Sequence, residues 1–105
     1  DARMDVSVQI CTLTSTLNAI RVQIDSIDDQ IVVLLGARQR AVEAAGRLKT
    51  DPAAIPAPDR VRFVIDRVSG MAASIGADPA LIARIYEHLI DCFIEHERRC
   101  HPRQV

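Results

Sequence analysis

The feature that most constrains the fold of this chain is a heptad pattern of apolar residues, which begins at Leu17 and continues for more than four repeats. Its two apolar positions hold Leu17, Ile24, Ile31, Arg38 and Ala45 and, three residues further on, Ile20, Ile27, Leu34, Ala41 and Leu48. Alternating spacings of three and four residues are typical of a helix that packs along another helix. The pattern predicts a long helix over residues 14–49, with Thr14 or Ser15 as its N-cap and Asp51-Pro52 after its end.

Two shorter helices are predicted downstream. Pro58 is a favoured first helical residue and Gly76 a typical residue just past a helix end, so they bound the second helix. Asp78 as N-cap and Pro79 as first residue begin the third, which ends near Arg99. Apolar stripes are formed by Val61, Val64, Ile65, Val68, Met71, Ala72 and Ile75 in the second helix and by Leu81, Ile82, Ile85, Leu89, Cys92, Phe93 and His96 in the third. Because the β-branched residues follow helical spacing, we expect an all-α fold without strands.

Length and composition limit the class of protein. The 105 residues suffice for one domain, which we expect over residues 13–101, between a loose leader (1–12) and a tail (102–105). The 13 Lys and Arg are balanced by 14 Asp and Glu, and aromatic residues make up only 3%. Nucleic-acid-binding domains usually show a basic excess and stacking aromatics, so we expect no nucleic-acid partner. No stretch approaches the ~20 apolar residues that cross a bilayer, so we expect no membrane association either.

The cysteine content indicates a reducing compartment. Cys11, Cys92 and Cys100 are odd in number and show no C-x-x-C spacing, which favours a reduced, cytoplasmic protein over a disulfide framework. The chain begins at Asp1, so an export signal removed beforehand stays open.

The length of the first predicted helix indicates a dimer. About 36 residues at ~1.5 Å per residue give ~54 Å, whereas a compact domain of this size has a radius of gyration of about 13 Å. Two shorter helices could cover one side of the long helix. Its apolar seam, which is formed by the two apolar heptad positions, requires a second long helix as a partner. We therefore expect an intertwined homodimer whose long helices pack antiparallel.

Three cations are spaced as such a dimer would require. Arg38 interrupts the apolar seam, so its charge needs compensation. Either it pairs with an acidic side chain or reaches solvent past its apolar stem, or it binds an anionic ligand. Lys49 lies about three turns further on the same face, and together the two resemble a site for a small dicarboxylate. Arg21 is about 25 Å from Arg38 along one helix, but in the antiparallel dimer the partner's Arg21 would fall between Arg38 and Lys49. Solvated surface charges are the alternative for Arg21 and Lys49.

Two further residues are candidates for the same site. Arg60 lies in the first turn of the second helix, where a cation gains nothing from the helix dipole, so it faces either a ligand or Asp59 or Asp66. Glu97 lies at the edge of the third apolar stripe. Partial burial would favour its neutral form, which could donate a hydrogen bond, whereas an exposed Glu is the alternative.

Metal sites are not expected. His88, Cys92, His96 and Cys100 recur every four residues, but this spacing drifts by about 40° per step on a helix, and two of the four belong to the apolar stripe. Asp25, Asp28 and Asp29 lack the glycine and glutamate of a calcium loop. No Gly-rich phosphate loop and no nucleophile motif occurs, so we expect no cofactor.

The run I-R-x-x-I-D-x-I-D-x-Q-I-V-x-L-L-x-x-R over residues 20–38, with Lys49 eleven residues later, resembles the all-helical class of chorismate mutases. The likeness extends from about Leu17 to Glu97. Residues 53–61 are especially similar to the isochorismate–pyruvate lyases of salicylate biosynthesis, which share this fold.

The resemblance implies a role for each candidate residue. Arg38 and the partner's Arg21 would hold two substrate carboxylates, and Arg60 would support the site. Lys49 would reach a carboxylate and the ether oxygen of the breaking bond. Glu97, which occupies a position that is Gln in many bacterial members, would in its protonated form donate a hydrogen bond to that oxygen, so kcat/KM should fall as pH rises.

Two departures concern the substrate. Val61 replaces a Glu that contacts the ring hydroxyl in bacterial mutases, and Ala57 replaces an Asp. The first interpretation is a chorismate mutase forming prephenate for Phe and Tyr synthesis in the shikimate pathway. The second is an isochorismate–pyruvate lyase, and 4-amino-4-deoxychorismate is a further possible substrate. A non-catalytic helical dimer that binds a partner protein is the interpretation from a different class.

Overall fold

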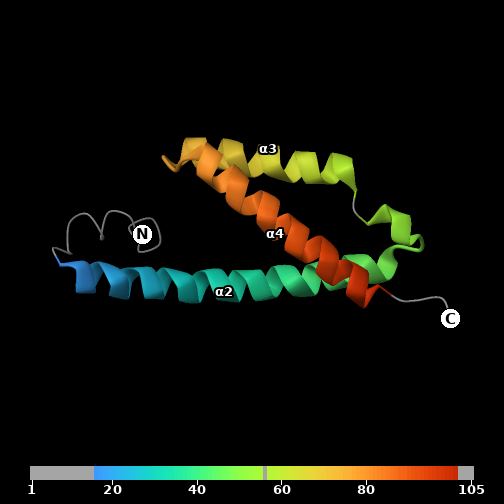
Figure 1. Cartoon of the computed structure of the whole chain (residues 1–105), viewed down its shortest axis with the longest axis horizontal. Coiled ribbons are helices and arrows are strands. Elements are labelled where there is room, and N and C mark those ends of the chain that lie inside the picture. The colour runs from blue at the N-terminus through green and yellow to red at the C-terminus, as the bar shows by residue number, and fades with distance from the viewer. Residues whose placement is uncertain (1–15, 56, 102–105) are drawn as a thin grey trace. The chain divides into compact units, whose positions relative to one another are not determined.

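The helices expected from the sequence are present. A computed structural model describes residues 16–55 and 57–101. These residues form α2 (Leu17–Leu48), the short 3-10 helix η1 (Pro52–Ala54), α3 (Pro58–Ser74) and α4 (Pro79–Cys100), with no strand among them (Figure 1). The prediction of an all-α fold with one long and two shorter helices is confirmed. The predicted leader, the tail and the two predicted N-caps Thr14 and Ser15 lie outside the described residues.

Local hydrogen bonds explain why α2 is shorter than predicted at both ends. The Thr16 hydroxyl oxygen accepts a hydrogen bond from the Ala19 N–H at 3.1 Å, so the helix begins at the next residue. At the other end the Lys49 N–H donates to the Gly46 carbonyl at 3.3 Å, which tightens the last turn. Asp51 is extended, as expected before a proline, and its carboxylate accepts from the Ala53 N–H at 2.9 Å to cap η1.

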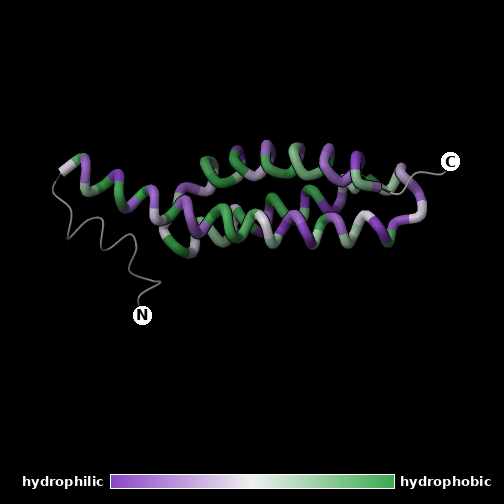
Figure 2. The backbone as a smooth tube through the Cα atoms, turned by 90° about the horizontal axis from the view of Figure 1, so that it is seen from below, coloured by the Kyte–Doolittle hydropathy of each residue, from purple (hydrophilic) through white to green (hydrophobic). Residues whose placement is uncertain are grey.

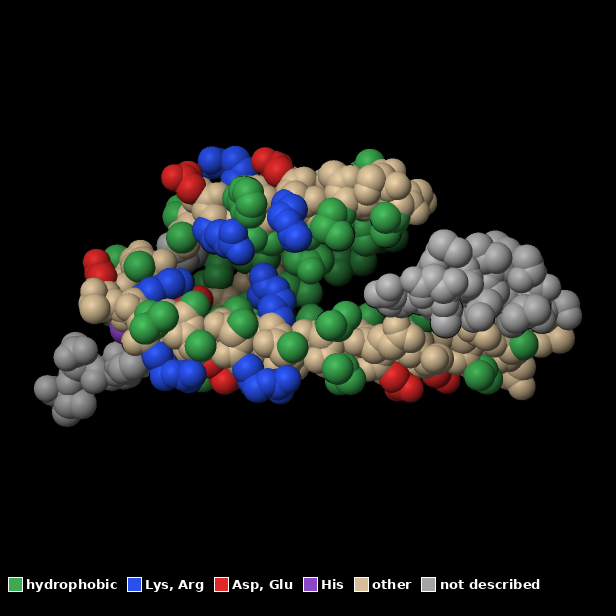
Figure 3. Space-filling model, turned by 180° about the vertical axis from the view of Figure 1, so that it is seen from behind, with side chains coloured by type: hydrophobic (Ala, Val, Ile, Leu, Met, Phe, Trp, Pro, Cys, Tyr) green, Lys and Arg blue, Asp and Glu red, His purple; other side chains and the backbone are tan. Residues whose placement is uncertain are grey.

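The chain divides into two compact parts between Arg38 and Gln39. The described portion of the first part is the beginning of α2, where hydrophobic and hydrophilic residues alternate along the backbone (Figure 2). Leu34 in the seam is 68% exposed, and Val33, outside the seam, is 69% exposed. Hydrophobic side chains accordingly lie at the surface along this helix (Figure 3). A helix that is apolar on several sides requires more cover than one neighbour provides.

The second part is built on a hairpin of α3 and α4, which pack against each other. Gly76 has a φ of 79°, and the Ala77 N–H donates to the Ala72 carbonyl at 2.8 Å, as in a Schellman motif. Asp78 then caps α4 by accepting from the Ala80 N–H at 3.0 Å. The predicted roles of Gly76 and Asp78 are therefore confirmed.

Only some of the predicted stripe residues are buried. The buried apolar residues are Ile55, Val68, Ala72 and Ile90. The stripe residues Met71, Ile75, Leu81 and Ile85 are exposed, because α3 and α4 bury one side against each other and leave their other apolar positions open. None of the helices among the described residues is both long and apolar enough to cross a membrane.

Candidate active site

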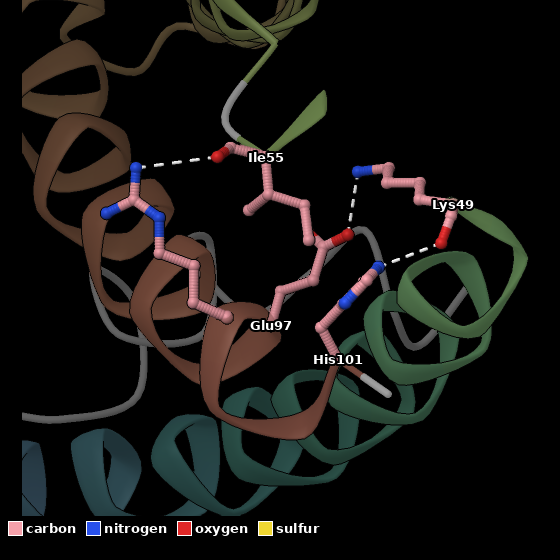
Figure 4. Close-up of polar contacts among 5 residues, drawn as sticks. Lys49, Ile55, Glu97 and His101 are labelled. Carbon is pink, nitrogen blue, oxygen red and sulfur yellow. Dashed lines mark hydrogen bonds and ion pairs between the residues drawn. The ribbon is translucent and has the colours of Figure 1, made fainter. Parts of the chain in front are cut away.

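Lys49 and Glu97 form the centre of the candidate site. Lys49 follows the last residue of α2, and Glu97 lies in the last turns of α4. The Lys49 Nζ donates to Glu97 Oε2 at 2.6 Å, with 30% of the lysine side chain and 10% of the glutamate side chain exposed (Figure 4). Glu97 is buried, which is the first of the two alternatives that the sequence left open. A half-buried cation thus lies at hydrogen-bond distance from a buried carboxyl group.

Residues at the end of α4 hold the segment that carries Lys49. His101 is buried, and its Nε2 lies 2.8 Å from the Lys49 carbonyl oxygen (Figure 4). Because a carbonyl oxygen only accepts, Nε2 must carry the proton. Arg98 donates from Nη2 to the Ile55 carbonyl at 3.5 Å, at the other end of the same connection. The loop between Lys49 and Ile55 is therefore anchored to α4 at both ends.

Gly46 permits the close approach of α4 to α2. It is buried, and a Cβ added there would lie 3.0 Å from Glu97 Cγ and 3.5 Å from Glu97 Oε2. Neither Gly46 nor His101 was assigned a role from the sequence. A glycine inside a helical pattern was the available signal for the first, because such a glycine costs up to about 1 kcal/mol relative to alanine. His101 lies past the end of the apolar stripe, where the pattern gives no signal.

A second polar contact joins the same two helices. Glu43 Oε2 lies 2.6 Å from His96 Nε2 and accepts a further hydrogen bond from Gln39 Nε2 at 3.1 Å. The hydrogen bond with His96, followed by that with Gln39, lowers the pKa of the Glu43 carboxyl group below its usual value. Glu43 therefore carries its charge at neutral pH.

The other residues predicted for the site, Arg21, Arg38 and Arg60, lie on α2 and α3. Arg60 is exposed, and its guanidinium lies over the Phe63 ring at 5.1 Å from the centroid, a cation–π contact rather than either of the predicted acidic contacts. Asp59 pairs instead with Arg62 at 3.5 Å. Arg21 is exposed and Arg38 half-buried, and both lie on α2 in the first compact part. The structure brings together Lys49 and Glu97, and the site roles of the three arginines stay predictions.

The described residues thus form an all-helical fold in which Lys49 meets the buried Glu97 where α4 contacts the end of α2. Comparison with known proteins identifies the family to which this fold belongs. Residues 20–98 match the family model described as chorismate mutase type II. The chain is also similar to a protein named isochorismate pyruvate lyase from Pseudomonas aeruginosa, with 37% identity over 78 residues, which cover 74% of this chain and 77% of the relative. This protein therefore belongs to the chorismate mutase type II family, whose members act on small chorismate-type molecules. The resemblance expected from the sequence is confirmed.

Proposed function

We propose that the chain rearranges chorismate to prephenate at a site centred on Lys49 and Glu97. The observation that carries the proposal is the 2.6 Å contact between Lys49 Nζ and the buried Glu97 carboxyl group, at two positions that the family resemblance assigns to the ether oxygen. In the proposed site, one cation and one carboxyl group act on the same substrate atom. Glu97 is buried and Lys49 is half-buried, and electrostatic stabilisation is stronger at such positions than in water.

This pair suits a reaction that needs neither a nucleophile nor a redox group. In the rearrangement the ether C–O bond breaks while a C–C bond forms between the pyruvyl methylene and the ring, and negative charge develops on the ether oxygen. Lys49 stabilises this charge, and a protonated Glu97 donates a hydrogen bond to it. The substrate brings two carboxylates, one of which takes the place of Glu97 as the partner of Lys49.

The arginines complete the site in this proposal. Arg38 and the partner's Arg21 bind the two carboxylates and hold the substrate in its reactive, folded conformer. Holding the reacting atoms in this geometry lowers the activation barrier. A homodimer is required for this exchange. It is supported by the exposure of Leu34, Ile31 and Ile24 along the seam of α2, which in a dimer would pack against the second copy.

Elimination of pyruvate from isochorismate, which leaves salicylate, is the second candidate. Two observations favour it: the relative that is 37% identical is named isochorismate pyruvate lyase, and Val61 replaces the Glu that bacterial mutases use at the ring hydroxyl. The same ether C–O bond breaks, and a ring hydrogen moves to the pyruvyl methylene. Lys49 would stabilise the same oxygen in both reactions.

The purified full chain should be incubated separately with chorismate, isochorismate and 4-amino-4-deoxychorismate. Prephenate, salicylate and pyruvate, and the rearranged amino product are then quantified by chromatography. We expect prephenate from chorismate to form with the highest kcat/KM. Salicylate with the highest kcat/KM would replace the first candidate with the second. No turnover of any of the three would favour a non-catalytic helical dimer that binds a partner protein.

Variants at the central pair test its role. Lys49→Ala should lower kcat/KM by about 10²–10³-fold, as loss of one oxyanion-stabilising donor does. Arg47→Ala removes an exposed cation in the last turn of α2 and should leave kcat/KM unchanged. Glu97→Gln, which donates a hydrogen bond at every pH, should remove the fall of kcat/KM with rising pH. A wild-type profile that is flat from about pH 5 to 8 would contradict the proton on Glu97.

A further inference from the structure

Three metal-binding side chains meet on the surface where α4 contacts the end of α2. We define the Glu43–His96–Cys100 cluster by these residues, of which Glu43 belongs to α2 and the other two to α4. His96 Nε2 lies 2.6 Å from Glu43 Oε2 and 3.6 Å from Cys100 Sγ. The three possible ligand atoms all lie within 4.8 Å of one another. One imidazole nitrogen therefore contacts both of the other groups.

These donors match the preferences of zinc. A thiolate, an imidazole and a carboxylate are its usual protein ligands, and at bond lengths of about 2.0–2.3 Å a tetrahedral ion separates its donor atoms by roughly 3.3–3.6 Å. The 3.6 Å contact between His96 Nε2 and Cys100 Sγ matches this separation, whereas the 2.6 Å contact between His96 Nε2 and Glu43 Oε2 is a hydrogen bond that an ion would have to replace. Small rotations of the three side chains, which move their donor atoms by about 1 Å, would make room for an ion between them. The charges also match, because a thiolate and a carboxylate neutralise a divalent cation.

The surroundings of the cluster support coordination. Gln39 Nε2 donates to Glu43 Oε2 at 3.1 Å and so orients the carboxylate, as the outer partners of metal ligands do. Cys100 is exposed, whereas Glu43 and His96 are half-buried, so a fourth position facing solvent is available to water.

We propose that the Glu43–His96–Cys100 cluster binds one Zn²⁺ per chain and links the end of α4 to α2. This ligand set differs from the four-residue series considered from the sequence, because Glu43 comes from another helix and neither His88 nor Cys92 belongs to the cluster. The site is separate from the reaction proposed above and does not depend on it. Its effect is structural: an ion held by both helices stabilises the folded chain and not the unfolded one.

Cobalt is the probe that reports the ligands. The full chain, freed of metal by a chelator and kept reduced, is titrated with Co²⁺. We expect one equivalent per chain to give tetrahedral d–d absorption and a near-ultraviolet thiolate-to-cobalt band, both removed by one equivalent of Zn²⁺. Cys100→Ser should abolish the thiolate band. The matched control Cys11→Ser/Cys92→Ser should keep it, although Cys92 has the same four-residue spacing from His96.

Zinc affinity provides the second measurement. Glu43→Gln and His96→Gln should each weaken Zn²⁺ binding at least tenfold by competition with a chromophoric chelator. Saturating Zn²⁺ should raise the Tm of the unmodified chain by roughly 5–10 °C and leave that of Cys100→Ser unchanged. Circular dichroism tests whether each variant is folded. If one of them does not fold, Cys100→Ala is measured in its place. Absence of a thiolate band, its loss in the Cys11→Ser/Cys92→Ser control, or a Tm insensitive to Zn²⁺ would overturn the proposal.

Discussion

At Gly46 the backbone of α2 leaves too little space for a further side chain next to Glu97. The Cβ of any other residue would lie 3.0 Å from Glu97 Cγ, closer than ordinary van der Waals contact. Gly46 thereby helps to decide where the carboxyl group meets Lys49. The two glycines Gly46 and Gly70 are both within helices, yet they have opposite surroundings, because a Cβ at the exposed Gly70 meets no described atom within 4 Å.

Alanine at each glycine should separate helix propensity from packing. Gly70→Ala should raise the free energy of unfolding by up to about 1 kcal/mol, since alanine is the better helix former, and should leave kcat/KM unchanged. Gly46→Ala gains the same propensity but displaces Glu97 by a few tenths of an ångström, so kcat/KM should fall about tenfold. Thermal unfolding and steady-state kinetics check both. Unchanged kinetics in Gly46→Ala would show that the close contact does not position Glu97.

At the scale of the elements, capping residues fix where the helices begin. Thr16 caps α2, and Asp78 caps α4, where its Oδ1 accepts from the N–H groups of Ala80 and Leu81 at 3.0 and 3.4 Å. The start of α4 also determines the phase of its buried stripe. Both Lys49 contacts to α4 depend on this phase, because Glu97 and His101 lie one turn apart near its end.

Removal of the α4 cap should destabilise the fold. Asp78→Ala leaves the first N–H groups of α4 without their acceptor and should lower the free energy of unfolding by about 1 kcal/mol. Asp78→Asn keeps an acceptor oxygen and should retain most of the stability. Urea unfolding followed by circular dichroism measures both variants. Equal stability of Asp78→Ala and the unmodified chain would contradict the role of the cap.

At the scale of the whole molecule, the proposed site is shared between two chains. The large apolar residues Val22, Val32 and Val33 are exposed on α2 in addition to the seam. A single α2 thus presents apolar surface on more than one side, which an intertwined partner would cover. The same arrangement would supply the partner's Arg21 to the site of Arg38.

Complementation between two inactive variants tests this exchange. Arg21→Ala and Arg38→Ala should each abolish most activity, because a carboxylate loses its guanidinium. In a mixed dimer one site regains both arginines and the other loses both, so random reassociation of equal amounts should restore about one quarter of the unmodified activity. Mixing Arg21→Ala with Arg21→Ala/Arg38→Ala should restore none. A mixture of the two single variants that stays inactive would show that each chain supplies its own pair.

The sequence by itself determined the elements, because the signals that begin and end a helix act within a few residues. Pro58, Gly76 and Asp78 mark helix boundaries through backbone geometry and local hydrogen bonds, and the structure has these boundaries. The family resemblance was carried in the same local way, by residues spaced along one helix. Arg60 lies over Phe63 rather than next to Asp59 or Asp66, because the two side chains, three residues apart, lie on one helix face. Its predicted contact with a ligand stays a prediction.

Only the tertiary structure decided which groups meet between helices. Lys49 and Glu97 are 48 residues apart, and Glu43 and His96 are 53 residues apart. Their contacts depend on how α4 packs against the end of α2 and on the space left by Gly46, and neither follows from a short stretch of sequence. Contacts of this kind form only when helices distant in the sequence pack against each other, so they are determined by the packing of the whole chain.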